Sequence, residues 1–238
     1  MSRTPGACRG DKKRGGTALS VQSLDLDFWN SKQRIAREKA NPGPDLWKGD
    51  CMKMLLHICC APCAVAIVEK FLQEQGMELG GLFFNPNIHP KEEFDKRKDA
   101  VLAMSQEYGV PVSVNELNML DYWRSSLPAD KRGRCSWCYS VRLEEAARYA
   151  AENGHDVFTT SLLISPYQDH ELIASIGEKA ASRHGIRFHY EDFRPLYRAG
   201  RERARGKQWY MQKYCGCYYS YAESDHPKKP IYFMENDL

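Results

Sequence analysis

The sequence predicts an α/β fold in three layers, in which helices cover both faces of a mostly parallel sheet and a helical, cysteine-containing segment follows. Two observations carry this prediction. Short apolar runs typical of buried strands alternate with amphipathic stretches typical of helices from about residue 53 to residue 190. The first run, Met54–Ile58, leads into a turn that holds Cys59, Cys60 and Cys63, and Pro62 suits the first turn of the helix that follows. Such alternation favours right-handed βαβ units.

The remaining elements follow in order along the chain. Further strands are predicted at Leu79–Phe84, Val110–Val114, Asp156–Thr160 and Arg187–Tyr190. Helices are predicted from Cys63 to about Gly76 and over Glu92–Tyr108, Ser136–Asn153 and His170–His184. The chain therefore contains one catalytic α/β domain, residues 53–224. Residues 1–52 are expected to be a largely disordered extension with room for a short helix and a linker, and residues 225–238 a tail.

Composition excludes several classes of protein. The chain has 238 residues, 42% hydrophobic and 27% charged, which is typical of a soluble globular protein. Its net charge of +3 does not by itself indicate a nucleic-acid partner. No apolar run approaches the roughly 18 residues of a membrane span, and the first residues lack the apolar core of a secretory signal. We therefore expect a cytoplasmic protein with no membrane partner.

Seven of the nine cysteines gather in three groups that indicate metal or redox chemistry. Clustered thiols in a chain without an export signal fit a reducing compartment. The groups are Cys59-Cys60-x-x-Cys63, Cys135-x-x-Cys138 and Cys215-Gly-Cys217. Each group alone is a modest signal, but their joint occurrence favours function over a purely structural role.

The first two groups predict a four-thiolate metal site. Cys59 and Cys60 close a strand, whereas Cys135 and Cys138 open a predicted helix, so both pairs can meet at one edge of the sheet. Four thiolates suit structural zinc or an iron–sulfur cluster, and the adjacent cysteines favour the cluster. Cys63 is either a thiolate able to hold a second metal or relay an electron, or a helix-start residue without a role.

Cys215-Gly-Cys217 predicts a reversible dithiol. A disulfide across one intervening residue closes a small, strained ring that is easily reduced, and Gly216 gives the backbone the freedom that such a ring requires. The pair could carry two electrons. The alternative is two unconnected core cysteines.

The stretch Arg194–Tyr214, which is rich in basic and aromatic residues, directly precedes this pair. Cations pair with phosphates and aromatic rings stack on unpaired bases, which is how RNA loops are recognised. Both this stretch and Arg134 adjoin cysteine groups, so we expect a role in RNA binding; a solvated helix face is the alternative. The candidate residues in the stretch are Arg201, Arg203, Arg205, Lys207 and Trp209.

Polar residues also follow two of the predicted strands. Asn85, Asn87 and His89 follow the second strand, and Asp169 follows the fourth. At the edge of the sheet these side chains could bind substrate, and His89 or Asp169 could supply a proton. Helix capping is the alternative, since Asp169 directly precedes a helix.

Five motifs in order give the chain a close resemblance to the epoxyqueuosine reductases of the QueH type, which are cobalamin-independent. The resemblance covers about residues 53–223 and leaves residues 1–52 outside. The motifs are Leu-His-Ile-Cys-Cys-Ala-Pro-Cys, Phe-Asn-Pro-Asn-Ile-His-Pro, Arg-Cys-x-x-Cys-Tyr-x-x-Arg-Leu, Thr-Thr-x-Leu-Leu-Ile-Ser-Pro-Tyr-Gln-Asp and Tyr-Cys-Gly-Cys.

The resemblance implies both the fold and the reaction. The fold would be of the HUP type that includes the PP-loop ATPases, but the Gly-rich phosphate loop of those enzymes is absent here, so no nucleotide is expected. The implied reaction reduces the epoxide of epoxyqueuosine at the tRNA wobble position to queuosine. A [4Fe-4S] cluster on Cys59, Cys60, Cys135 and Cys138, a redox-active Cys215–Cys217 pair, and an external one-electron donor such as a ferredoxin or flavodoxin are implied as well.

An additional iron at Cys63 is left open. Two other functions are also left open: a tRNA thiolation or nucleotide-activating enzyme on the same fold, and a non-catalytic RNA-binding module stapled by zinc.

Overall fold

The computed structural model describes residues 51–117, 119, 128 and 130–224. Contacts divide the chain into two units, Met1–Cys51 and Met52–Leu238, and the account below concerns the second. The predicted N-terminal extension, apart from Cys51 and Met52, and the predicted C-terminal tail lie outside the described residues.

A five-stranded sheet of order β3-β2-β1-β4-β5 forms the middle layer, and every pair of neighbours is parallel. The chain moves outward from β1 to one edge and then returns to pass to the other, so β1 lies at the centre. Its Leu56 is opposite Gly81 on one side and Thr159 on the other. This confirms the predicted sheet. The strands are β1 (Met52–His57), β2 (Met77–Phe84), β3 (Val112–Asn115), β4 (Val157–Thr160) and β5 (Arg187–Phe188).

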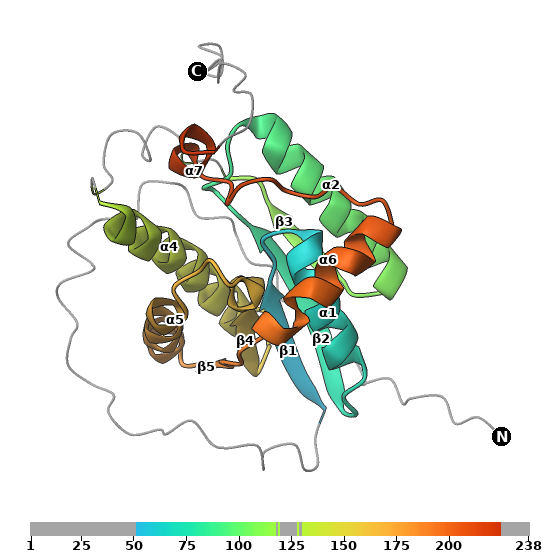
Figure 1. Cartoon of the computed structure of the whole chain (residues 1–238). Coiled ribbons are helices and arrows are strands. Elements are labelled where there is room, and N and C mark those ends of the chain that lie inside the picture. The colour runs from blue at the N-terminus through green and yellow to red at the C-terminus, as the bar shows by residue number, and fades with distance from the viewer. Residues whose placement is uncertain (1–50, 118, 120–127, 129, 225–238) are drawn as a thin grey trace. The chain divides into compact units, whose positions relative to one another are not determined.

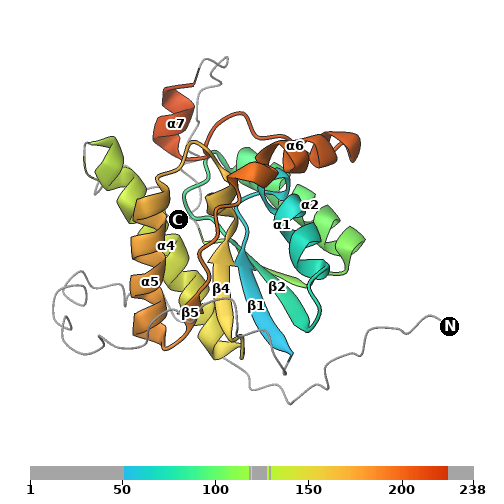
Figure 2. The same cartoon turned by 60° about the horizontal axis from the view of Figure 1, so that its bottom comes forward.

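Helices cover both faces of the sheet, as Figure 1 and Figure 2 show. On one face lie α1 (Ala61–Leu72), α2 (Lys91–Tyr108) and α6 (Tyr197–Gly206), and on the other lie α4 (Lys131–Glu152) and α5 (His170–His184). Short helices η4 (Ser161–Ile164), η5 (Arg194–Leu196) and α7 (Tyr218–Ala222) complete the described chain. None of the helices in this part of the chain is both long and apolar enough to cross a membrane.

The core forms where the apolar faces of the strands and helices meet. Phe71 of α1, Phe83 of β2 and Phe158 of β4 are fully buried there. Burial of a large apolar side chain contributes roughly 1.5–3 kcal/mol, so residues from the whole alternating pattern stabilise the sheet. The carboxyl ends of β1, β2 and β4 are thereby fixed relative to one another.

Several predicted boundaries need correction. Helix α1 ends at Leu72 rather than near Gly76, and β2 begins at Met77 rather than Leu79. The third strand begins at Val112 rather than Val110, because Pro111 has no N–H and only its carbonyl pairs, accepting from Gly81 N at 2.8 Å. The fifth strand has two residues, Arg187 and Phe188. Helix α4 begins at Lys131 rather than Ser136, because Asp130 caps it by accepting from Gly133 N at 2.8 Å.

Candidate metal centre and thiol pair

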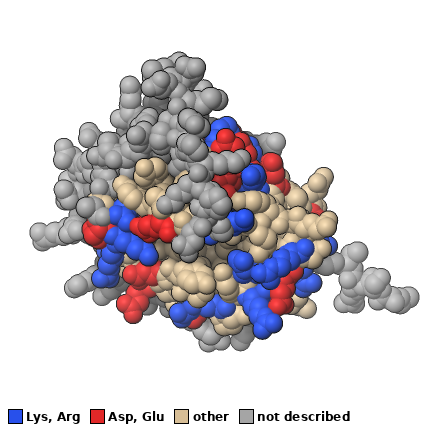
Figure 3. Space-filling model, turned by 45° about the horizontal axis from the view of Figure 1, so that its top comes forward, with Lys and Arg blue, Asp and Glu red and all other residues tan. Residues whose placement is uncertain are grey.

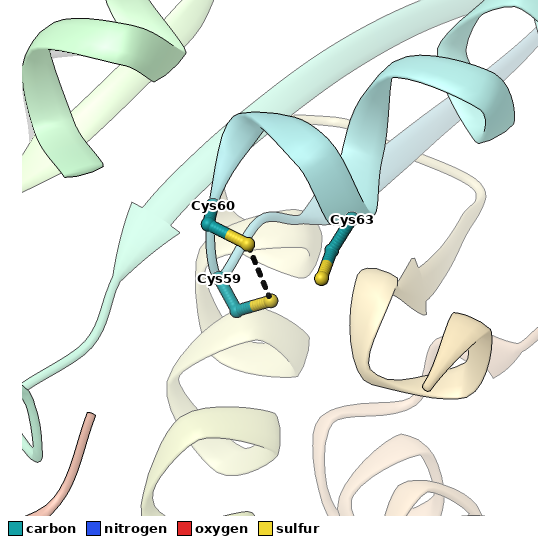
Figure 4. Close-up of side chains that lie close together, drawn as sticks. All are labelled: Cys59, Cys60 and Cys63. Atoms are coloured by element: carbon teal, nitrogen blue, oxygen red, sulfur yellow. Dashed lines mark hydrogen bonds between the residues drawn. The ribbon is translucent and has the colours of Figure 1, made fainter. Parts of the chain in front are cut away.

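Three cysteines gather where β1 passes into α1. Cys59 and Cys60 follow the end of β1, and Cys63 lies in the first turn of α1. Their sulfurs turn toward one another (Figure 4) and all lie within 4.8 Å. The Sγ atoms of Cys59 and Cys60 are 3.7 Å apart. Soft donors at this spacing are suited to a thiophilic metal.

Hydrogen bonds make Cys59 the thiolate of the three. The thiols of Cys60 and Cys63 hold the pKa of Cys59 well below its usual range, and Ser161 helps to lower it. Ser161 Oγ lies 3.3 Å from Cys59 Sγ and accepts from Cys59 N at 2.9 Å. The pKa of Cys60 is raised, by burial first, and that of Cys63 by the hydrogen bonds that it donates. The turn therefore concentrates one negative charge on Cys59.

The second cysteine pair lies in α4, near its start as predicted, but the helix begins before Cys135 rather than at Ser136. Because α4 begins at Lys131, Cys135 and Cys138 occupy its early turns, and Arg142 follows on the same face. Burial raises the pKa of both thiols, and the nearby thiols of Cys215 and Cys217 raise it further. The α4 pair therefore shares its surroundings with the third group.

Arg142 connects the three cysteine groups. Its side chain is 2% exposed, and its Nε donates to the carbonyl of Cys138 at 3.2 Å. Its positive charge lowers the pKa of Cys59 on the first group and acts on Cys138 and Cys215 on the other two. Its Nη2 is buried without a hydrogen-bond partner in the described part of the chain. A cation thus lies among the thiols.

The third group occupies the loop between α6 and α7. Cys215 Sγ accepts from Gln168 Nε2 at 3.7 Å, and Cys217 is the N-cap of α7, its sulfur accepting from Ser220 N at 3.4 Å. Both cysteines are free thiols. Gly216 between them has φ +118°, a conformation that favours glycine, which agrees with the predicted freedom of this loop.

An ion pair on α2 fixes that loop. Arg97 and Glu93 are 2% and 7% exposed, and Arg97 Nε lies 2.7 Å from Glu93 Oε1. The two other guanidinium nitrogens donate to the carbonyls of Cys215 and Tyr214, at 3.0 and 2.9 Å. Tyr210 donates to Glu93. Every nitrogen of this buried guanidinium is therefore paired.

The three polar residues after β2 are buried beside the same loop. Asn85 is fully buried, and Asn87 and His89 are 1% exposed. Asn85 Nδ2 donates to the carbonyl of Ile58 at 2.8 Å, and His89 N donates to that of Gly216 at 2.8 Å. Both polar atoms of the Asn87 side chain, both ring nitrogens of His89 and Asn85 Oδ1 have no partner within the described structure. Burial lowers the pKa of His89 to about 4.

Asp169 caps a helix, which is the alternative that the sequence left open. Its carboxylate accepts from Leu172 N at 3.0 Å at the start of α5. It lies close to Tyr139, whose hydroxyl accepts from Asp169 N at 3.4 Å and donates to Gln168 at 2.6 Å. A role for Asp169 as proton donor stays a prediction.

The basic stretch includes α6, and two of its cations pair with acids on α1 and α2. Figure 3 shows Lys and Arg side chains interspersed with Asp and Glu on this face of the molecule. Arg203 lies 2.8 Å from Glu69, and Lys207 pairs with Glu107. Gly200 lets α6 approach the first turn of α1, since a Cβ there would lie 2.7 Å from the carbonyl of Pro62. The helix therefore lies beside the cysteine turn.

The other predicted RNA-binding residues differ in their exposure. Arg205 is exposed and Arg201 is half-buried against Tyr197. Trp209 packs on Tyr108 with ring centroids 6.5 Å apart. Arg134 lies over the ring of Tyr219 at 4.1 Å and 3.5 Å from Glu223, so it joins α4 to α7. The RNA-binding role of these residues stays a prediction.

The sequence indicated no role for several residues that contact the cysteine groups or support those contacts. Arg97 and Glu93 are spaced as an i, i+4 ion pair, which does not reveal burial, and Arg142 follows Cys138 by one helical turn. Ser161 and Gln168 lie in a motif that the sequence singled out. Gln212 donates to Cys63 Sγ at 3.4 Å and carried no signal in the sequence.

The proposed four-thiolate set stays a prediction. Among the described residues, the group whose ligand atoms all lie within 4.8 Å is Cys59, Cys60 and Cys63. Cys135 and Cys138 are linked to that group through the charge of Arg142. The donors fit an iron–sulfur group, because it prefers thiolates and brings negative charge to a buried cation. They also fit a redox dithiol beside it.

A protein-family model described as epoxyqueuosine reductase QueH matches residues 54–223, a range that includes all three cysteine groups. The epoxyqueuosine reductase QueH of Dehalococcoides mccartyi is 38% identical over 180 residues, which are 75% of this chain and 98% of that protein. The QueH of Haemophilus influenzae is 35% identical over 181 residues, 73% of each chain. That of Thermotoga maritima is 30% identical over 179 residues, 71% of this chain and 91% of its own.

Among solved structures, the U34-tRNA thiolase NcsA from Methanococcus maripaludis with its [4Fe-4S] cluster aligns with 75% of this chain and 64% of its own. The TM-score is 0.47 and the sequence identity is 19%.

Proposed function

The chain belongs to the QueH family of epoxyqueuosine reductases, and from this premise we propose how its thiols carry out the reduction. The reaction removes the epoxide oxygen of epoxyqueuosine in tRNA and leaves queuosine. Both C–O bonds of the epoxide break, a C=C bond forms, and the oxygen leaves as water. The reaction therefore consumes two electrons and two protons, and the site must deliver both.

Cys59, Cys60, Cys135 and Cys138 would hold a [4Fe-4S] cluster. The observation that carries this assignment is the convergence of three separate cysteine groups on the buried Arg142. Such a cluster, when bound, would supply one-electron transfer, whereas Lewis-acid polarisation of a C–O bond would need an additional iron with an open position. Cys63 is close enough to Cys59 to take part in holding an additional iron. No residue in this arrangement calls for a nucleotide.

Cys215 and Cys217 would supply the electron pair. Oxidation of two thiols to a disulfide releases two electrons and two protons, which matches the demand of the epoxide. Gln168 holds the sulfur of Cys215, and Arg97 holds the backbone of the loop. An external one-electron donor of the ferredoxin or flavodoxin class would then restore the dithiol. A thiol-rich centre of this kind is stable in the reducing cytoplasm, where we place the protein.

The tRNA would be bound through its anticodon loop. The buried and unpaired atoms of Asn85, Asn87 and His89 provide hydrogen-bonding capacity for polar groups of the modified base. Arg134, which directly precedes Cys135, and the exposed Arg205 would contact phosphates. Arg203 and Lys207 would exchange their carboxylate partners for phosphates, while Arg201 and Trp209 would line the approach.

The decisive experiment uses the full chain reconstituted anaerobically with iron and sulfide. Incubation with epoxyqueuosine-containing tRNA and a chemical reductant should yield queuosine after nuclease digestion and mass spectrometry. Cys135→Ala should lose the broad visible absorbance, and Cys215→Ser should keep it but lose the product. Ser136→Ala, which alters a neighbouring residue on α4, is the matched control and should behave as wild type.

Two results would count against the proposal. A colourless protein that holds zinc tightly would overturn the cluster. A fully loaded protein that makes no queuosine would overturn the assignment of the electron path, as would unchanged turnover in Cys215→Ser.

A further inference from the structure

Arg142 is buried in the core, yet it has no acidic partner among the residues that the structure describes. Its side chain is 2% exposed, and none of the ion pairs in the described structure includes it. Its one hydrogen bond is from Nε to the Cys138 carbonyl, one turn earlier in α4, and Nη2 is unpaired. A guanidinium does not lose its proton in proteins, so a full positive charge lies in the interior.

Arg97, the other buried arginine near the thiols, shows how a buried positive charge is neutralised elsewhere in this fold. Arg97 is equally buried, but Glu93 neutralises it, and two backbone carbonyls accept from its remaining nitrogens. A buried charge without a partner costs several kcal/mol. The described part of the chain supplies no such partner for Arg142, which points to a bound ligand.

The groups facing Arg142 identify the chemistry of that partner. Cys59, Cys138 and Cys215 approach it from the β1–α1 turn, from its own helix and from the α6–α7 loop, and Tyr139 is also near. All three cysteines can become thiolates, and four thiolates around a divalent metal carry a net charge of −2. This negative charge has the sign, and would lie at the place, that the unpaired guanidinium of Arg142 requires in a partner.

We propose that Arg142 is the counter-ion of the metal–thiolate centre, with Nη2 donating to a metal-bound sulfur. The inference rests on the proposed function only in requiring that these thiolates bind metal. As a positioning residue, Arg142 would stabilise the loaded centre and favour its reduced form, which carries one more negative charge. Loss of this cation should weaken metal binding and shift the midpoint potential to a more negative value.

The first test uses Co²⁺ alone with the metal-free full chain, because cobalt–thiolate bands report sulfur ligation directly. Arg142→Met should bind Co²⁺ at least tenfold more weakly than wild type, and Arg142→Lys, which keeps the charge, should recover most of the affinity. Arg148→Met is the matched control, since Arg148 lies on the same helix but pairs with Glu145 and Glu152. Circular dichroism checks folding, and Arg142→Gln replaces the Met variant if that variant unfolds.

The second test follows the midpoint potential of the iron-loaded protein. It should fall in Arg142→Met and return toward the wild-type value in Arg142→Lys. Equal Co²⁺ affinity in wild type and Arg142→Met, or no thiolate-bound Co²⁺ in wild type, would overturn the inference. If Co²⁺ binding depends on Arg142 but no iron cluster assembles, the inference stands and the proposed cofactor fails.

Discussion

A buried arginine lies on each side of the thiol centre, but among the described residues only one of the two has a carboxylate partner. On the α2 side, Arg97 is neutralised by Glu93, and the same network fixes the backbone of Tyr214 and Cys215. On the α4 side, Arg142 Nη2 has no partner among the described residues, and the groups near its charge are thiols, a tyrosine and the buried His57. The first side is complete within the described chain, whereas the second leaves a charge for a ligand to neutralise. Unsatisfied buried groups of this kind mark where the protein binds.

The largest loss of stability is expected when Arg97 on α2 is deprived of its carboxylate partner, which leaves it in the same situation as Arg142 on α4. Glu93→Gln leaves Arg97 charged and without a carboxylate, so it should destabilise the metal-free chain by about 3–5 kcal/mol. Arg142→Met removes a charge that already lacks a partner, so it should cost less than about 1 kcal/mol or be stabilising. Urea unfolding of both variants measures the contrast.

Glu92→Gln, on the exposed start of α2, is the control and should change stability little. Similar losses in Glu93→Gln and Arg142→Met would remove the distinction between the two sides.

A substitution in the Cys215–Cys217 loop, whose backbone is bound by Arg97, should also destabilise the α2 side. A Cβ at Gly216 would lie 3.0 Å from Arg97 Nη1 and 3.1 Å from Ile88, at φ +118°. Gly216→Ala should therefore cost on the order of 2 kcal/mol and slow the oxidation of the Cys215–Cys217 pair. Gly206→Ala, where a Cβ meets nothing within 4 Å, should be neutral. A fully stable Gly216→Ala would show that the loop is not held as tightly as described.

The buried ring of His89, beside the same loop, should make the stability of the protein depend on pH. Burial lowers the pKa of this ring from the ordinary value of 6.5 to about 4, so as pH falls below 6.5 the unfolded chain takes up a proton that the folded chain does not. The stability present above pH 6.5 is then lost, by about 2 kcal/mol between pH 7 and pH 5. Chemical unfolding at both pH values measures it.

In the same measurement, His89→Gln should remove that part of the acid loss, while the loss due to other groups remains. An identical loss in wild type and His89→Gln would mean that the ring is not held neutral by burial.

The smallest effect is expected from one hydrogen bond of the loop. Tyr214 donates to the carbonyl of His89 at 2.6 Å, and Tyr214→Phe should cost about 1 kcal/mol. Thermal unfolding detects a loss of this size. Tyr167→Phe, on an 82% exposed residue, provides the control. If Tyr214→Phe lost more stability than Gly216→Ala, the main contact that fixes the loop would be that of Tyr214 rather than that of Arg97.

Local patterns in the sequence predicted much of the fold. Apolar runs such as Met54–Ile58 lie close to strands of the structure, because burial on both faces requires continuous apolar residues. The Cys59–Cys63 turn lies at the carboxyl end of β1, as the order of strand and helix requires. The start of α4 was missed, since Asp130 caps a turn with little apolar periodicity.

The sequence by itself determined the parallel α/β sheet, the family and the cysteine groups, because these depend on residue order and short-range spacing. Only the tertiary structure decided that Arg97 and Arg142, from helices on opposite faces of the sheet, both lie near the thiols, and that Glu93 neutralises just one of them. Whether a charge is buried and paired depends on contacts between distant segments. A charged residue in a helical pattern carries no sign of those contacts, which is why the unpaired guanidinium emerged only from the folded chain.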